Sequence, residues 1–533
     1  MDIESKKEKF VISRDFENGS EDSASFAPPK YISWIYKLDN FGIETRGIER
    51  VSTEERRSLA ANKSSLNRFL HVFGLWIAAC GGLTTMSSFF LPTLLFGLSM
   101  KDSLICGLIS MNLGCLVPAY CSTMGPKSGC RQMVGARFLF GQWGVKFVSL
   151  ICIVGGIGWS VVNCVLGGQI LIAINNNIPL SVGIVIIGVI SLVIAIFGIR
   201  VLLNFQTILS IPLIIASILF YVVVLKKVDY VHESNVLVAE QGFSGLTVRG
   251  NWLSFFAIGY SVTATWGSGA SDYYILFPEE TPSYQIFIVT FLGIAVPSTF
   301  VAIIGTICGS IAYAYQPWND AYNNFGIGGL INECFKPWGR FGSFIVVLLY
   351  ISLICNNIMN TYSVAFEFQL IDRKLAYIPR WCWAIVMTII YVVLSVAGKE
   401  HFSTILSNFL PMLGYWISMY ITILLEENIF FRSSIKTKTL HHNEFDEKAN
   451  SDWSYNWSNW NKPKGITMGL AADLSFAIGV VGAVLGMNQV YFQGPIAKKI
   501  GDYSGDVGMW LCGGFTGVVY PFLRYWELKR FGR

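Results

Sequence analysis

The 533-residue sequence is poor in charged residues. Only 14% of its residues are Asp, Glu, Lys or Arg, whereas 53% are hydrophobic, and the mean hydropathy is +0.51. A typical soluble domain has about 25% charged residues. Because so few charges cannot cover a surface that faces water, the composition excludes a soluble protein of this length and indicates that lipid is the outer solvent.

Clustered metal ligands and catalytic groups are also missing. The twelve Cys are scattered without a C-x-x-C pair, mostly within apolar runs, and the five His form no cluster with them. The apolar runs contain neither a nucleophile–base pair nor paired acids, so we expect no metal site, no cofactor and no enzyme. The net charge of +5 comes from residues between the apolar runs, which argues against nucleic acid as a partner.

What the sequence has instead is a series of apolar stretches, each about the 20 residues that a helix needs to cross a bilayer. Since backbone polar groups must be paired inside lipid, continuous runs of this length predict helices rather than barrel strands. The predicted fold class is therefore an all-α integral membrane protein with twelve transmembrane helices, at about 69–98, 102–121, 145–174, 181–199, 203–225, 250–272, 286–314, 341–368, 379–397, 404–425, 467–489 and 507–526.

The distribution of basic residues predicts the topology. Loops on the side of the N-terminus carry 18 Lys and Arg and those on the other side carry 9, so both termini are expected in the cytosol. Residues 1–66 are polar and are predicted to be a disordered cytosolic tail, followed by a transporter domain at 67–533. Within it, 426–466 is expected to be a cytosolic loop and 527–533 a short cytosolic C-terminus.

Two of the predicted spans are interrupted. Cys80 and Gly81, followed by a second glycine, break the first span, and Gly, Ser and Thr surround Trp266 in the sixth. If the first ten helices form two five-helix halves, these breaks occupy matching positions, which is the best sequence indication of a binding site at the membrane midplane. The alternative is that the glycines only allow close helix packing.

Polar residues also stand in the middle of the third and eighth spans. Trp159 and Asn163 are four residues apart, as are Asn356 and Asn360, with Asn357 beside them, so each pair shares a helix face. Buried amides need partners in lipid and should face the bundle interior. Together with Trp266 they indicate a slot for a flat, uncharged heteroaromatic ligand. The alternative is that the amides join helices and the tryptophans anchor at the lipid surface.

Carboxylates near the spans are few, and Asp272 follows the broken sixth span directly. An intramembrane carboxylate can carry a coupled proton, so Asp272 is a candidate for proton coupling. It could equally cap a helix or bind an Arg on the cytosolic side.

In order and spacing, several segments resemble the fungal purine–cytosine permeases, a branch of the nucleobase–cation symporters. They are GIETRGIERVSTEER before the first span, GCRQMVGARFLFG after the second, GWSVVN in the third, the asparagines of the eighth and the terminal RYWELKRFGR. The resemblance implies a LeuT-type fold with two inverted five-helix repeats plus two C-terminal helices. It also implies substrate stacked on Trp159 and bonded by Asn163 and the amides of the eighth helix.

Within that branch, HVFGLWIAACGGLTTMSSFF and SVTATWGSGASDYYILFPEETP are most similar to the vitamin B6 transporters of the plasma membrane. This resemblance implies import of pyridoxine, pyridoxal and pyridoxamine by alternating access. The sequence departs from the nucleobase carriers at Ala78, Cys80 and Met359. Sodium-coupled relatives have hydroxyl side chains where this chain has Ile354 and Cys355, and the loss of these oxygen ligands favours protons as the coupled ion. A proton-coupled purine or cytosine importer and a receptor without transport are the alternatives.

Overall fold

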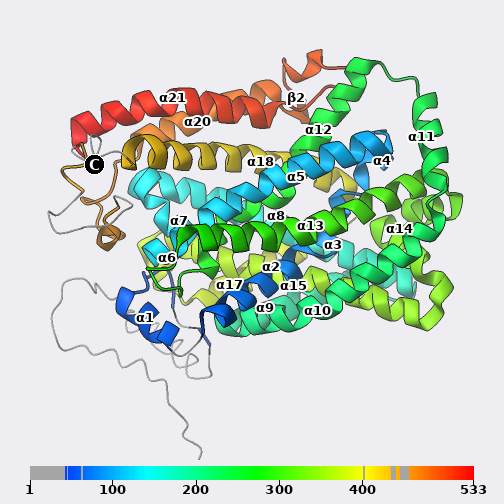
Figure 1. Cartoon of the computed structure of the whole chain (residues 1–533), viewed down its shortest axis with the longest axis horizontal. Helices are drawn as coiled ribbons and strands as arrows, with labels where there is room; N and C mark the ends of the chain where they lie inside the picture. Colours follow the sequence, from blue (N-terminus) through cyan, green and yellow to red (C-terminus); the bar gives the residue numbers. More distant parts are fainter. Residues whose placement is uncertain (1–42, 45, 62–63, 400–401, 434–439, 445–454) are drawn as a thin grey trace, which may run out of the picture.

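In the computed structural model the chain forms a bundle of long helices, shown in Figure 1. The structure describes residues 43–44, 46–61, 64–399, 402–433, 440–444 and 455–533. Helices coincide with all the predicted spans: α2 (Ser65–Cys80) with α3 (Leu83–Ser88) and α4 (Leu91–Leu94), α5 (Met100–Ser122), α8 (Arg137–Ile174), α9 (Leu180–Ile196), α10 (Ile199–Val224), α12 (Gly245–Ala264), α13 (Ser283–Ala314), α15 (Gly339–Ile371), α17 (Arg380–Gly398), α18 (Phe402–Glu426), α20 (Leu470–Gly486) and α21 (Gly508–Phe531).

The lengths of these helices suit a membrane. Eight helical segments of the described residues are long and apolar enough to cross a bilayer, and the apolar helices α9 and α20 have 17 residues each. The remaining two, α12 and α21, are not among the eight, because α12 is rich in Gly and polar residues and α21 ends in charged ones. The all-α membrane architecture is thus confirmed, whereas the exact number of twelve spans stays a prediction.

The first five spans and the next five pack in matching ways. The second span lies against the seventh (α5 on α13), the third against the eighth (α8 on α15) and the fourth against the ninth (α9 on α17). The first span, α2, packs on α10 and α13, and the sixth, α12, packs on the corresponding α18 and α5. Two inverted five-helix repeats produce this reciprocal pattern. The last two helices, α20 and α21, pack on each other and on α18 at one edge of the bundle (Figure 1).

Shorter elements cover the two ends of the bundle. One end carries α1 (Thr53–Ala61) and the C-terminus (Figure 1). The opposite end carries α11 (Tyr230–Glu240), α14 (Gln316–Phe335) and the strand pair β1–β2 (Asn488–Gln489 and Phe492–Gln493). Both ends of the described chain therefore lie on the same side of the bundle.

The N-terminal segment differs from the expectation of a disordered tail up to residue 66. Residues 1–42 lie outside the described residues, but 53–61 form α1, which is docked onto the bundle. Arg56 is fully buried and pairs with Glu279 at 3.2 Å, and the Thr53 hydroxyl donates to the same carboxylate at 2.8 Å. The prediction of disorder is therefore wrong for this part, because α1 exchanges contact with water for contact with loops of the bundle.

The two predicted C-terminal loops also carry structure where the chain is described. A π-helix, η7 (Glu427–Arg432), continues α18 into the predicted 426–466 loop, and Glu427 and Arg432 are buried. The helix α21 runs through most of the predicted 527–533 tail and ends at Phe531.

Candidate functional site

The break in the first span is held open by side chains of α15. The Asn356 amide donates to the Ala79 carbonyl at 2.9 Å, and the Leu83 N–H donates to the Ser352 hydroxyl at 2.9 Å. A side chain at Gly82 would collide with Ser352, since its Cβ would lie 2.3 Å from the Ser352 Cβ. A helix end in lipid needs such partners for its unpaired backbone groups. The glycines therefore allow both the interruption of the helix and the close approach of α15.

The sixth span is broken at the corresponding place. After α12 ends, the chain continues in two 3₁₀ turns, η4 (Thr265–Ser268) and η5 (Ala270–Tyr273). Hydroxyl groups bond the local carbonyls: Thr265 donates to Ser261 O and Ser268 donates to Thr265 O, each at 2.9 Å. Small and hydroxyl-bearing residues therefore satisfy a backbone that is no longer a regular α-helix.

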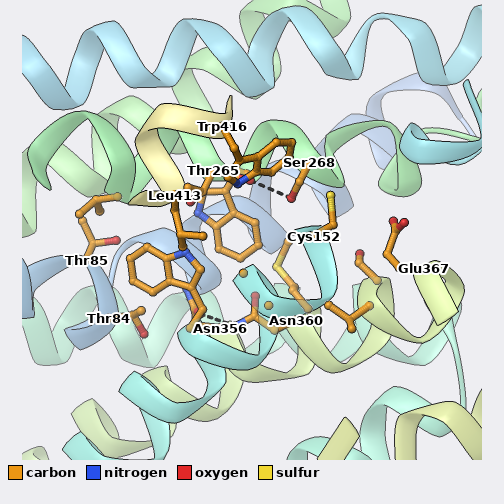
Figure 2. Close-up of a pocket in the computed structure, with 18 of the residues that line it drawn as sticks. Thr84, Thr85, Cys152, Thr265, Ser268, Asn356, Asn360, Glu367, Leu413 and Trp416 are labelled. Carbon is orange, nitrogen blue, oxygen red and sulfur yellow. Dashed lines mark hydrogen bonds between the residues drawn. The ribbon is translucent and has the colours of Figure 1, made fainter. Parts of the chain in front are cut away.

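A cavity lies where the two breaks meet α8, α15 and α18 (Figure 2). Figure 2 shows Thr84 and Thr85 on one side of it and Glu367 on the other, with Asn356, Asn360 and Cys152 between them. Its lining is mostly apolar with a few polar groups, as is usual for small-molecule sites. The residues around it are Thr84, Thr85, Cys152, Gly155, Gly156, Trp159, Val262, Thr265, Trp266, Ser268, Tyr273, Asn356, Met359, Asn360, Ser363, Val364, Glu367, Leu413 and Trp416.

Aromatic rings from three different segments form part of the cavity wall. Trp159 comes from α8, Trp266 from η4 and Trp416 from α18. The fully buried Trp76 contacts the Trp266 ring edge-on, with centroids 5.7 Å apart at 81°, and contacts Tyr273 in the same way at 5.5 Å. Edge-to-face pairs are a preferred arrangement, so Trp76 fixes the orientation of two rings that line the cavity.

A chain of hydrogen bonds connects the amides. The Thr84 hydroxyl donates to Asn163 Oδ1 at 2.6 Å, and Asn163 Nδ2 donates to Asn356 Oδ1 at 2.9 Å. Asn360 Nδ2 also donates to Asn356 Oδ1, at 3.4 Å (Figure 2). Among the described residues no donor bonds the Asn360 carbonyl oxygen or the Thr85 hydroxyl, although both residues line the cavity. These two groups are free to bond a ligand.

Comparison with known proteins identifies the architecture. The model of a family described as permeases for cytosine/purines, uracil, thiamine and allantoin matches residues 62–508. The chain belongs to this family. It is 49% identical to the vitamin B6 transporter TPN1 of Saccharomyces cerevisiae, over 94% of this chain and 90% of that protein. It is 28% identical to the purine-cytosine permease fcyB of Emericella nidulans, over 100% and 99%.

The fold of this permease has also been seen in a solved structure. Mhp1, a nucleobase-cation-symport-1 family transporter in a closed conformation with bromovinylhydantoin bound, superposes with a TM-score of 0.62. The likeness covers 87% of this chain and 93% of Mhp1 at 13% identity, so it shows the fold alone. The expected LeuT-type architecture is confirmed, and the relatives are permeases and transporters rather than enzymes.

The permease brings four of the nine predicted site residues to the cavity wall: Trp159, Trp266, Asn356 and Asn360. Asn163 lies directly behind the wall, fully buried and bonded to two lining side chains. Cys80 and Gly81 are buried at the break without lining the cavity, and Asn357 turns to α17, where its amide donates to Tyr391 at 3.2 Å. Asp272 also lies outside the lining, since its carboxylate accepts from the Gln132 N–H at 2.9 Å.

The lining residues that were not identified as site residues from the sequence include Thr84, Thr85, Ser363 and Glu367. Two signals were available for them. The two threonines directly follow the Gly-Gly break, where a helix resumes, and Ser363 and Glu367 stand 7 and 11 residues after Asn356. These spacings continue the face that Asn356 and Asn360 begin.

Proposed function

We propose that this permease imports vitamin B6, that is pyridoxine, pyridoxal and pyridoxamine, across the plasma membrane together with protons. The observation that carries the proposal is the 49% identity to a vitamin B6 transporter over 94% of the chain. Transport occurs by alternating access, in which the broken spans α2–α3 and α12–η4 open the cavity to one side at a time. Both termini lie in the cytosol, in line with the excess of basic residues on that side.

The cavity suits a substituted pyridine. A flat ring stacks on Trp159 and Trp266, while Asn356 and Asn360 bond its polar edge. Asn163 orients Asn356 from behind the wall. Met359 adds an apolar, adaptable surface in place of a further polar group, and this favours a ring with methyl and hydroxymethyl substituents.

The experiment is uptake of labelled pyridoxine by cells that lack their own carrier and express this chain. We expect saturable uptake that unlabelled pyridoxal and pyridoxamine compete with and that collapses when an uncoupler removes the pH gradient. Uptake that is insensitive to the uncoupler would contradict the proton coupling but not the substrate, and it would indicate facilitated diffusion of vitamin B6.

A purine or cytosine importer is the second candidate, because fcyB shares 28% identity over the whole length of this chain. Unlabelled cytosine and adenine as competitors separate the two substrates. Complete competition by cytosine at the same concentration as pyridoxine would overturn the vitamin B6 proposal in favour of this one.

A further inference from the structure

Glu367 is the one carboxylic acid among the described residues that line the cavity. It is 5% exposed, and its Oε2 is buried without a hydrogen-bond partner in the described part of the chain. It shares a face of α15 with Asn356, Asn360 and Ser363, at intervals of four, seven and eleven residues from the first. Its side chain lies across the cavity from Thr84 in Figure 2.

Among the described residues, no Lys, Arg or His forms an ion pair with Glu367, although Arg131 lies near enough to act on it as a positive charge. The charged and titratable groups around it are Cys152 of α8, Asp272 of η5 and Arg131, with the Ser149 hydroxyl beside it. The Arg131 guanidinium lies 3.4 Å from Glu44 and packs on the ring of Phe366, 3.5 Å from its centroid. An unpaired carboxylate inside a membrane protein is costly. Glu367 is therefore stable as a neutral acid when the cavity is closed and as an anion only when water reaches it.

The sequence-based candidate, Asp272, lies in a different environment. Its Oδ1 accepts the Gln132 N–H, and Arg131 stands nearby as a positive charge. These contacts hold the Asp272 side chain in place and tie η5 to the start of α7 (Gln132–Gly135). A group that must gain and lose a proton in each cycle needs a place on the substrate cavity and no permanent partner. Glu367 lines the cavity, and its Oε2 bonds no other described residue.

We propose that Glu367 carries the coupled proton, an inference that rests on the proposed transport function. When the cavity faces outward, the carboxylate takes one proton from water and becomes the neutral acid, which allows the loaded cavity to close. When the cavity opens inward, the acid returns that proton to water. Glu367 stands four residues before the end of α15, and Tyr362 on the same helix contacts Glu44 of the N-terminal segment. The proton is therefore released toward the end of the bundle that holds both termini.

The test separates coupling from transport in reconstituted vesicles. Equal potassium and valinomycin clamp the membrane potential, and labelled pyridoxine is added outside at a pH one unit below that inside. At one proton per molecule the wild type should accumulate pyridoxine about tenfold. Glu367→Gln, which is permanently neutral, should lose this accumulation and reach a ratio of about one, while still exchanging labelled for unlabelled pyridoxine at equal pH.

Glu426→Gln is the matched control, because Glu426 is a half-buried carboxyl of α18 that does not line the cavity, and its accumulation should equal that of the wild type. Wild-type-like accumulation by Glu367→Gln overturns the inference. Loss of both accumulation and exchange in Glu367→Gln also overturns it, because Glu367 would then be a binding group. The inference is likewise overturned if Asp272→Asn loses accumulation while Glu367→Gln keeps it.

Two further outcomes are distinguishable. If Glu367→Gln does not reach the membrane, Glu367→Asp retains a carboxyl at a shifted position and should accumulate pyridoxine with a displaced pH profile. An unchanged profile contradicts the inference. A wild type that carries no pyridoxine overturns the proposed function, and the same vesicles with labelled cytosine then test Glu367 independently.

Discussion

The cavity and the buried ion cluster between η7 and α21 both remove polar side chains from water, but they leave those side chains in different states. In the cluster, Arg524 donates to both carboxylate oxygens of Glu427 at 2.9 Å, and Arg432 donates to both oxygens of Glu444 at 2.9 and 3.1 Å. Tyr520 and Arg432 add further bonds to Glu427 at 2.8 Å. In the cavity, Thr85, Asn360 and Glu367 each keep a polar atom that no other described residue bonds.

The difference separates structure from function. A satisfied ion cluster has one stable arrangement, and it joins the loop after α18 to the last helix of the chain. A cavity whose polar atoms remain unpaired is less stable by itself, and a ligand that pairs them recovers that free energy as binding. Substitutions in the cluster should therefore change the amount of folded protein, whereas substitutions in the cavity should change transport at constant amount.

The largest effect is expected for Arg524→Met. It leaves Glu427 with a single Arg, and breaking a buried ion pair by removing one partner costs about 3–5 kcal/mol. The amount of permease in the membrane and the melting temperature of the purified protein should both fall. Arg530→Met on the exposed side of α21 is the control and should leave both unchanged. Normal thermal stability of Arg524→Met would show that the ion cluster does not stabilise the folded protein.

Trp159→Ala should have the next largest effect and a different signature. Loss of a stacking surface of this size costs roughly 3 kcal/mol, so pyridoxine uptake should fall by about a hundredfold, to background, with normal surface expression. Trp143→Ala is the matched control in the same helix, because Trp143 is 76% exposed. Trp159→Phe should recover part of the uptake. Full uptake by Trp159→Ala would show that the ring does not stack on substrate.

The sequence was sufficient for two of the cavity's aromatic residues and both of its amides, because these types are rare at membrane depth, whereas Trp416 and Tyr273 were not identified. Trp159, Asn356 and Asn360 stand out in apolar helices, and the helical period places each pair on one face. Glu367 was one of the few carboxylates near the spans, but Asp272 was preferred because it directly follows the broken sixth span. Only the continued spacing from Asn356 along α15 distinguishes the two.

The ion cluster and the helix α1 could not be predicted for another reason. Glu427 and Arg524 are 97 residues apart, and no local pattern indicates that they pair. Arg56 likewise finds Glu279 across 223 residues. Composition marks the segment of α1 and the start of the loop after α18 as polar, but polarity alone does not distinguish a solvated segment from one whose charges are buried in pairs.

Two neighbouring asparagines give a sharper test within one helix. Asn360→Ala removes a carbonyl oxygen that the cavity leaves unpaired, and the loss of one hydrogen bond to substrate should raise the KM for pyridoxine about tenfold, or roughly 1.4 kcal/mol. Asn357→Ala removes the bond to Tyr391 on α17, so it should lower stability and leave KM unchanged. Equal rises of KM in both variants would contradict the assignment of Asn360 to the cavity face of α15 and of Asn357 to the face that packs on α17.

Thr85→Val should have the smallest effect, and for that reason it tests the comparison most closely. The change keeps the shape of the side chain and removes a hydroxyl that bonds no described residue, so it should cost the folded protein nothing. The KM for pyridoxine should rise about threefold, or roughly 0.6 kcal/mol, through one lost bond to substrate. Thr84→Val is the matched change next to it, and it should lower stability as well as transport because Thr84 donates to the buried Asn163. A destabilised Thr85→Val with unchanged KM would show that its hydroxyl supports the fold, as the side chains of the ion cluster do.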